Sequence, residues 1–290
     1  MQSSETVLLR QPIDSPELIR LLVLDLDGTT VGVSNEVKPT VKRAVQAAQA
    51  KGVQVAIATG RMFRSALRFH QDLGSTLPLM TYQGALIKEP ATGIIQRHLT
   101  VPQALAIELL DYLEQSDLQQ QLSIHCYKDD RLYVRKLTEE SVEYAERSEV
   151  EPTPVGDLRL LVQQGEPTKL LALSQNIELI DQLWRSLSQR YEPEQLYFTK
   201  SVPTFLEATH PLANKGTAVH YLAEALGLSS ENVMAIGDNY NDLEMIEYAG
   251  VGVAMGTAPD AVKAAATWVA PDVESDGVAA AIEQFILSAD

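Results

Sequence analysis

Four aspartates stand out as the residues best suited to chemistry, because they lie within or shortly after two short apolar runs of the sequence. Asp25 and Asp27 end the first run, and Asp238 and Asp242 follow a second run near the other end of the chain. Two carboxylates ~4 Å apart repel each other by roughly 4 kcal/mol at an effective dielectric of 20. A group of four is therefore costly unless a cation lies among them. Carboxylate oxygens with few imidazoles nearby favour Mg²⁺ over zinc.

Some of these aspartates also have ordinary structural explanations. Asp27 precedes Gly28, and Asp-Gly is a frequent turn pair. Asp242 stands where a helix is expected to begin and could be its N-cap. Asp25 has no such explanation, because it lies inside the apolar run. Together the four carboxylates favour a metal site, although the turn and the cap remain alternatives.

Two further segments are suited to holding an anion. Thr59 and Gly60 stand at a predicted strand-to-helix turn, where a hydroxyl and backbone N–H groups can bind a phosphate. Lys215 opens a predicted helix, where a positive charge opposes the helix dipole. That small misfit favours a functional lysine. The alternatives are a simple helix cap by Thr59 and an exposed lysine.

The segments that must position these residues alternate between strand and helix patterns at both ends of the chain. We predict strands at 21–26, 53–58, 77–83, 233–236, 251–255 and 268–270, and helices at 39–51, 62–73, 215–226, 242–248, 258–266 and 278–287. This alternation indicates a doubly wound α/β fold with a parallel, Rossmann-like sheet. In such a sheet, functional groups collect at the carboxyl ends of the strands.

The middle of the chain has a different pattern. We predict strands at 123–127, 132–137, 158–162, 170–173 and 196–198, and helices at 104–113 and 177–187. This mixture indicates an α+β module. We therefore predict a discontinuous core domain, 1–85 and 207–290, interrupted by an inserted α+β domain at 86–206. Residues 1–18 are predicted to be an irregular extension with no assigned role.

Composition excludes several classes of partner. The 290 residues include 23 Lys and Arg against 39 Asp and Glu, a net charge of −16. Such a chain is a poor partner for nucleic acid or an anionic membrane. The single cysteine, Cys126, excludes an internal disulfide and favours a reduced, cytoplasmic compartment. We find no signal-peptide pattern and no apolar run of the ~18–20 residues that would span a bilayer. The oligomeric state stays open.

Taken in order, four short motifs carry a resemblance to a known family. They are Asp25-Leu26-Asp27-Gly28-Thr29, Thr59-Gly60-Arg61, Lys215, and Gly237-Asp238-Asn239-Tyr240-Asn241-Asp242. In this order they resemble the motifs of the haloacid dehalogenase-like (HAD) hydrolases. The chain is similar to the Cof-type branch, in which a C2-type cap is inserted between motifs two and three. Tyr82-Gln83-Gly84-Ala85 and Asp276-Gly277-Val278 also resemble that branch.

The resemblance implies a role for each matching residue. Asp25 would be the nucleophile that forms an aspartyl-phosphate, and Asp27 the general acid and base. Mg²⁺ would be held by Asp25, the backbone carbonyl of Asp27 and Asp238, with Asp242 acting through a water molecule. The phosphoryl oxygens would be held by the Leu26 and Gly60 backbones and by the side chains of Thr59, Lys215 and Asn241.

The implied activity is a Mg²⁺-dependent phosphatase acting on small phosphorylated metabolites, such as sugar phosphates or phosphorylated cofactors. Asp27, two residues after the nucleophile, goes with phosphoryl transfer rather than carbon–halogen cleavage. A phosphomutase using the same aspartyl-phosphate is the alternative. Its usual cap would lie between motifs one and two, where this chain has only one predicted helix and one strand. A non-catalytic module that binds phosphometabolites is a third reading.

No motif identifies the cap residues that select a substrate. His125, Cys126 and Tyr127 are expected to alternate between the faces of a half-buried strand. The arginines that follow motif two, Arg61, Arg64 and Arg68, are expected to form a solvated helix face, although Arg64 could reach an anionic substrate.

Overall fold

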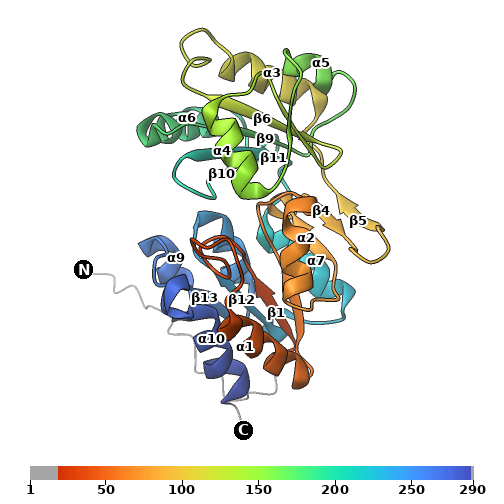
Figure 1. The fold of residues 1–290 in the computed structure, drawn as a ribbon, viewed down its shortest axis with the longest axis vertical. Coiled ribbons are helices and arrows are strands. Elements are labelled where there is room, and N and C mark those ends of the chain that lie inside the picture. Colours follow the sequence, from red (N-terminus) through yellow and green to blue (C-terminus); the bar gives the residue numbers. More distant parts are fainter. Residues whose placement is uncertain (1–18, 289–290) are drawn as a thin grey trace, which may run out of the picture.

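A computed structural model describes residues 19–288 of the chain. The predicted extension at 1–18 lies outside the described residues. The described residues form two lobes stacked along the long axis, and the first strand, β1 (Leu21–Leu24), and the last α-helix, α10 (Gly277–Ile282), both lie in the lower one (Figure 1). Among the described residues, the longest apolar helices fall short of the length and hydropathy that a membrane span requires.

The lower lobe is built on a five-stranded parallel sheet. Its order is β14-β13-β12-β1-β2, from strands β1 (Leu21–Leu24), β2 (Gln54–Ile57), β12 (Val233–Gly237), β13 (Val251–Ala254) and β14 (Trp268–Val269). The predicted parallel α/β core is therefore confirmed. β1 lies between β12 and β2, and all three run parallel, so the segments that follow these strands begin at one edge of the sheet.

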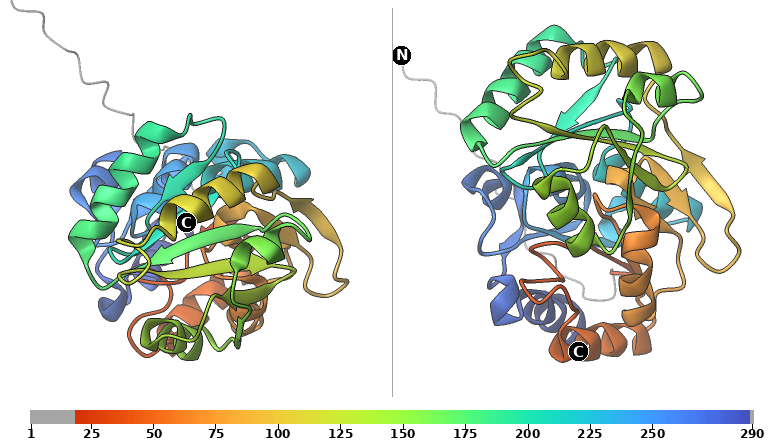
Figure 2. Two further views of the ribbon diagram at one scale, coloured as in Figure 1. Left: turned by 90° about the horizontal axis from the view of Figure 1, so that it is seen from above. Right: turned by 45° about the horizontal axis from the view of Figure 1, so that its top comes forward.

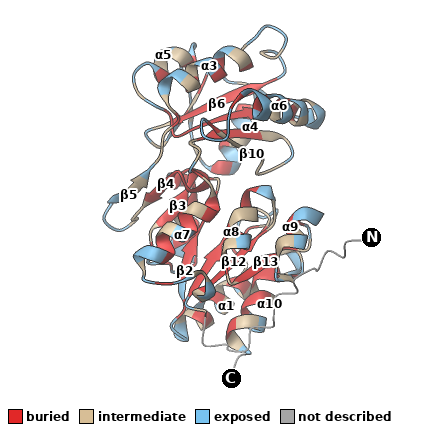
Figure 3. Cartoon of the chain, turned by 180° about the vertical axis from the view of Figure 1, so that it is seen from behind, coloured by how far each residue is buried: buried red, intermediate tan, exposed pale blue. Residues whose placement is uncertain are grey.

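Helices cover both faces of this sheet. Successive strand residues point to opposite faces, so each strand contributes side chains to the apolar cluster on either side. Leu22 and Leu24 pack in one apolar cluster with α1 (Pro39–Ala50) and α10 (Gly277–Ile282). Leu21 and Val23 pack in another with α7 (Lys215–Ala225). The four residues of β1 are fully buried, and the sheet runs as a buried layer between its helices (Figure 3). The remaining helices of this lobe are α2 (Phe63–Asp72), α8 (Leu243–Tyr248) and α9 (Asp260–Ala265).

The upper lobe, which we call the cap, is a mostly antiparallel six-stranded sheet. Its order is β10-β11-β9-β6-β7-β8, from strands β6 (Ser123–Lys128), β7 (Arg131–Val134), β8 (Pro152–Pro154), β9 (Lys169–Leu173), β10 (Tyr197–Thr199) and β11 (Phe205–Thr209). Helices α3 (Gln103–Leu113), α5 (Leu158–Val162) and α6 (Ile177–Arg190) pack on its outer face. Helix α4 (Glu139–Ser148) lies on the other face, toward the lower lobe (Figure 2). This is the predicted inserted α+β module, and its boundaries at 86 and 206 stay a prediction.

The structure corrects the prediction in several elements. Residues 158–162, predicted as a strand, form helix α5, whose first turn is capped by the Asp157 side chain through the Arg159 N–H. This five-residue segment, with four apolar residues and Arg159, is too short to show the period of either a helix or a strand, and the Asp157 cap favours the helix. The sequence prediction also missed α4, β8 and β11 in the cap. It missed β4 (Leu86–Lys88) and β5 (Ile95–His98) as well, which form a small antiparallel sheet with β3 (Leu79–Thr81) beside the core.

Candidate active site

The chain turns sharply where β1 ends, and this turn presents the first two aspartates. The Leu26 carbonyl accepts the N–H groups of Thr29, Thr30 and Val31, which closes the loop on itself. Asp25 is still in register with the sheet, because its N–H donates to the Ile236 carbonyl at 3.0 Å. The residue is 4% exposed. Asp25 is therefore a buried carboxylate at the carboxyl edge of the sheet.

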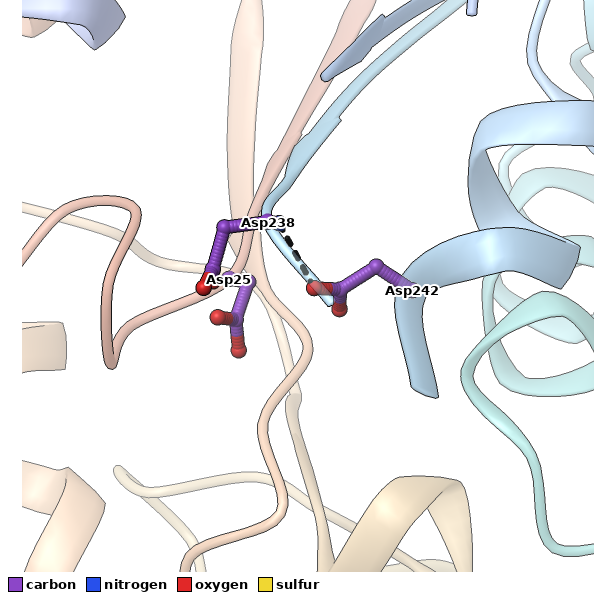
Figure 4. A group of neighbouring side chains, drawn as sticks. All are labelled: Asp25, Asp238 and Asp242. Carbon is purple, nitrogen blue, oxygen red and sulfur yellow. Dashed lines mark hydrogen bonds between the residues drawn. The ribbon is translucent and has the colours of Figure 1, made fainter. Parts of the chain in front are cut away.

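Asp238 and Asp242 come to the same point from the end of β12. Carboxylate oxygens of Asp25, Asp238 and Asp242 lie within 4.8 Å of one another (Figure 4). The Asp242 carboxylate accepts the N–H groups of Asp238 at 2.8 Å and Asn239 at 3.0 Å, so it ties the loop rather than capping α8. Asp238 accepts from the Thr29 hydroxyl at 2.9 Å. The structure thus brings together three of the four predicted aspartates.

Lys215 lies inside this acidic cluster and not on the surface. Its ammonium donates to Asp25 at 2.6 Å and to Asp242 at 2.5 Å, and the side chain is fully buried. Helix α7 places it there, with Asn214 capping the first turn through the Thr217 N–H. Burial alone lowers the pKa of Lys215, but the two carboxylates outweigh it and hold that pKa above its usual range.

The cluster is short of positive charge. Burial first, and then the charge of Asp242, raises the pKa of Asp25 well above its ordinary value. The same two causes raise the pKa of Asp238 to about 7. Carboxylates with raised pKa values need either protons or a cation. The donor set contains only carboxylate oxygens, which suits a hard divalent cation, so the residues present fit a metal site.

The residues that we predict to bind an anion lie beside the aspartates. A cavity of about 270 Å³ is lined by Asp25, Asp27, Thr59, Gly60, Asp238 and Asn241 from the lower lobe. Thr59 is buried, and its hydroxyl accepts from the Arg61 N–H at 3.1 Å. The remaining predicted site residues, Leu26, Lys215 and Asp242, are fully buried outside the lining. Lys215 reaches the site through its contact with Asp25.

Asp27 is held by Arg61, which the sequence assigns to a solvated helix face. The Arg61 guanidinium donates to both Asp27 oxygens, from Nε at 2.7 Å and from Nη2 at 2.6 Å. Burial raises the pKa of Asp27, but this bidentate pair outweighs it, and the pKa is lower than usual. The expectation of a solvated helix face is wrong for Arg61, which is 8% exposed and precedes α2. Its position after Thr59 and Gly60, at a strand end, was the available signal.

The two later arginines join the lobes. Arg64 pairs with Asp130, which also accepts the first N–H groups of α2 from Phe63 and Arg64. Arg68 pairs with Glu149. Neither arginine lines the cavity, so the suggestion that Arg64 reaches a substrate has no support from this arrangement.

The cap closes the cavity with side chains from α4, β9 and β11. They include Glu140, Glu143, Tyr144, Arg147, Lys169, Leu171, Phe205 and Glu207. His125, Cys126 and Tyr127 are each fully buried, because helices cover both faces of the cap sheet. The expectation of a half-buried strand is therefore wrong for them. Burial lowers the pKa of His125 to about 3, which leaves it neutral.

A parallel sheet with an aspartate cluster at its carboxyl edge, under an inserted α+β domain, defines a class of capped α/β proteins. The sequence profile of one such family, the haloacid dehalogenase-like hydrolases, matches residues 22–282. The chain belongs to this family. The family resemblance and the fold inferred from the sequence are both confirmed.

Individual relatives are similar to this chain along nearly its whole length. YxeH of Bacillus subtilis is 31% identical over 278 residues, covering 93% of this chain and all of YxeH. The Escherichia coli pyridoxal phosphate phosphatase YbhA is 28% identical and covers 93% of this chain and 98% of its own. The solved structure of TM0651 from Thermotoga maritima has a TM-score of 0.76 at 31% identity, over 92% of this chain and 97% of that one.

Proposed function

We propose that the protein is a Mg²⁺-dependent phosphatase that hydrolyses small phosphorylated metabolites through an aspartyl-phosphate on Asp25. The observation that carries this proposal is the buried Asp25 carboxylate in the cavity lining, grouped with Asp238 and Asp242 and 2.6 Å from the Lys215 ammonium. The names of relatives support the reaction class, since YbhA is named a pyridoxal phosphate phosphatase. Sugar phosphates and phosphorylated cofactors are the substrates we propose.

In the first step, an Asp25 oxygen attacks phosphorus while the bond to the leaving alkoxide breaks. Asp27 gives the leaving oxygen its proton. Water then attacks the aspartyl-phosphate, Asp27 takes a proton from that water, and inorganic phosphate leaves. Lys215 holds Asp25 in place and offsets its charge. Thr59, Asn241 and the backbone N–H groups of Leu26 and Gly60 hold the phosphoryl oxygens.

The acidic cluster is the proposed place for Mg²⁺. Asp25, the Asp27 carbonyl and Asp238 would hold it, and Asp242 would act through a water molecule. When bound, the ion neutralises the carboxylates and polarises the phosphoryl group. A reducing cytoplasmic compartment belongs to the same proposal, because the single cysteine is a free, buried thiol.

The pairing with Arg61 adds a step that concerns Asp27. In the arrangement described, Arg61 favours the Asp27 carboxylate, the form that takes a proton from water. Before it can protonate a leaving alcohol, Asp27 must therefore acquire a proton and leave the guanidinium fork. We propose that Arg61 holds Asp27 between turnovers.

The test is phosphate release from p-nitrophenyl phosphate and from a panel of phosphorylated metabolites, with and without MgCl2. We expect turnover that chelator abolishes and that Asp25→Asn reduces by several orders of magnitude. Asp129→Asn is the matched control, because that aspartate is exposed on the β6–β7 turn. No release across the panel, or equal rates for Asp25→Asn and wild type, would refute the proposal. Isomerised sugar phosphate without free phosphate would favour a phosphomutase.

A further inference from the structure

One sequence motif has no role in the mechanism above, although the structure places it against the phosphate site. Tyr82-Gln83-Gly84 links β3 to β4, and all three residues have positive φ: 53°, 60° and 89°. Such a backbone is unfavourable for Tyr and Gln, so other contacts must hold it. The Gln83 N–H donates to the Thr59 carbonyl at 3.0 Å, and the Tyr82 N–H to the Arg61 carbonyl at 2.9 Å.

The Gln83 side chain enters a buried network that joins the two lobes. Its amide nitrogen donates to Glu207 of the cap strand β11 at 3.0 Å, and its amide oxygen accepts from Asn241 at 3.1 Å. Gln83 and Glu207 are each 1% exposed. Gly60 makes room for this amide, since a Cβ at Gly60 would lie 2.4 Å from the Gln83 nitrogen.

Glu207 is fixed from the cap side. Its Oε2 accepts from the Lys169 ammonium at 2.7 Å, and its Oε1 also accepts from the Ser201 hydroxyl. Lys169 in turn donates to the Gly60 carbonyl at 2.9 Å, across the boundary between the lobes. Three residues of the phosphate site and its neighbourhood, Gly60, Gln83 and Asn241, are thus connected to one buried ion pair of the cap.

The chemistry of these groups imposes a direction on the network. A carboxylate accepts hydrogen bonds and cannot donate them, so Gln83 must present its NH₂ group to Glu207. The Gln83 oxygen therefore faces Asn241, and Asn241 must present its own NH₂ group there. That group has two hydrogens, and Gln83 occupies one. The second stays available to a phosphoryl oxygen in the cavity that Asn241 lines.

We propose that Gln83 and Glu207 are positioning residues of the phosphate site: the cap carboxylate orients the Gln83 amide, which makes Asn241 a donor toward phosphate. This inference rests on the proposed function, because it assigns Asn241 to the phosphoryl group. With the network broken, the Asn241 amide can rotate by half a turn and present its oxygen to an anion, which repels it. The cap thereby contributes to phosphate binding without contacting the phosphate.

The test is the affinity for inorganic phosphate, measured by calorimetry with saturating MgCl2 and so independent of turnover. Gln83→Met has a side chain of similar length without the amide, and it leaves the Lys169–Glu207 pair intact. We expect it to weaken phosphate binding about tenfold or more, the loss typical of a hydrogen bond to a charged group. Gln49→Met is the matched control, because the Gln49 amide donates to the Leu73 and Gly74 carbonyls and does not line the cavity.

A double-mutant cycle separates positioning from general structural damage. In an Asn241→Ala background, Gln83→Met should have no further effect on phosphate affinity, because there is no amide left to orient. A loss of the same size in both backgrounds would overturn the inference, as would unchanged affinity in the single variant.

A second variant keeps the test independent of how Gln83→Met folds. Glu207→Met combined with Lys169→Met replaces the buried ion pair by apolar side chains, an exchange that proteins tolerate better than removal of one partner. It should show the same loss and the same dependence on Asn241, and additivity with Asn241→Ala would again contradict us. Wild-type protein that binds phosphate but hydrolyses no ester would refute the proposed function and leave this inference standing.

Discussion

Gly28 follows Asp27 and precedes Thr29 in the first motif, and its substitution tests the acidic cluster. Its φ is +82°, and a Cβ added there would lie 2.3 Å from one Asp238 oxygen and 2.9 Å from the other. Non-bonded heavy atoms settle at about 3.5 Å, so Gly28→Ala must push the Asp238 carboxylate back by about 1 Å. The Thr29 hydroxyl, which donates to Asp238, must yield as well.

Two effects of Gly28→Ala have different sizes. Positive φ costs an alanine about 1 kcal/mol, which lowers the melting temperature of a chain of this length by about 2–4 °C. Displacement of a metal ligand by about 1 Å can reduce kcat/KM about 100-fold. We therefore expect a small loss of stability, a large loss of activity, and a higher MgCl2 concentration for half-maximal rate.

Gly52→Ala is the matched control, because Gly52 has a φ of +88° and no atom within 4 Å of the position of a Cβ. It should show the same loss of melting temperature with wild-type kinetics. The measurements are thermal unfolding and p-nitrophenyl phosphate hydrolysis across a MgCl2 series. If Gly28→Ala retains activity within a few-fold of wild type, or if Gly52→Ala loses as much, the placement of Asp238 in the metal site is refuted.

Three further predictions follow from the geometry of the site and the cap. Arg61→Met removes the cation that lowers the pKa of Asp27, so the fall in rate at high pH with alkyl phosphates, which need a general acid, should move to higher pH; an unchanged pH profile would contradict the role of Arg61, and Arg43→Met on the exposed face of α1 is the control. Because the pKa values of Asp25 and Asp238 are raised in the folded protein, stability without metal should fall as pH rises from about 4, the unfolded pKa of aspartate, to about 7, the folded pKa of Asp238. MgCl2 should therefore raise the melting temperature more at pH 8 than at pH 5, and an equal rise at both would count against the cluster as the metal site. Burial raises the pKa of Cys126 to about 12, so a thiol reagent at pH 8 should modify this cysteine only after denaturation, and rapid labelling of the native protein would show that the cap sheet is not closed as described.

The functional candidates that could be recognised from the sequence are residues that do not suit their local secondary structure. Asp25 interrupts an apolar run, and Lys215 opposes a helix dipole, so each is conspicuous from its neighbours in the sequence alone. The structure gives one reason for both, since Lys215 donates to Asp25 at 2.6 Å. The parallel core was predictable for a similar reason: its strands are buried on both faces and read as continuous apolar runs.

The features that the sequence concealed depend on contacts between distant positions. From the sequence, Arg61 is an ordinary surface arginine. The structure shows that its Nε and Nη2 donate to the two carboxylate oxygens of Asp27, 34 positions away. Gln83 and Glu207 are 124 positions apart, and no spacing rule connects them. Helix α5 was missed because five residues, four of them apolar, are too few to show a period, and β5 because its side chains are largely exposed and polar. Long-range pairing and short elements are where local patterns carry least information.

The charges of the site explain why uncharged donors matter in it. Four carboxylates, Asp25, Asp27, Asp238 and Asp242, face two cations, Lys215 and Arg61, both already engaged with them. The formal balance of −2 is the charge that one divalent cation would neutralise. Lys169, a further cation of the cavity lining, is bound to Glu207. Arg147 lies 3.9 Å from Asp27 with 68% of its side chain exposed.

A phosphate dianion entering this cavity therefore finds few unpaired cations in the described part of the chain. Its binding must depend on the metal and on neutral donors: backbone N–H groups, the Thr59 hydroxyl and the Asn241 amide. A hydroxyl can rotate to suit its partner, but an amide presents a donor at one end and an acceptor at the other. Asn241 is thus the donor whose orientation has to be set from outside, and Gln83 is the residue in contact with it that can do so.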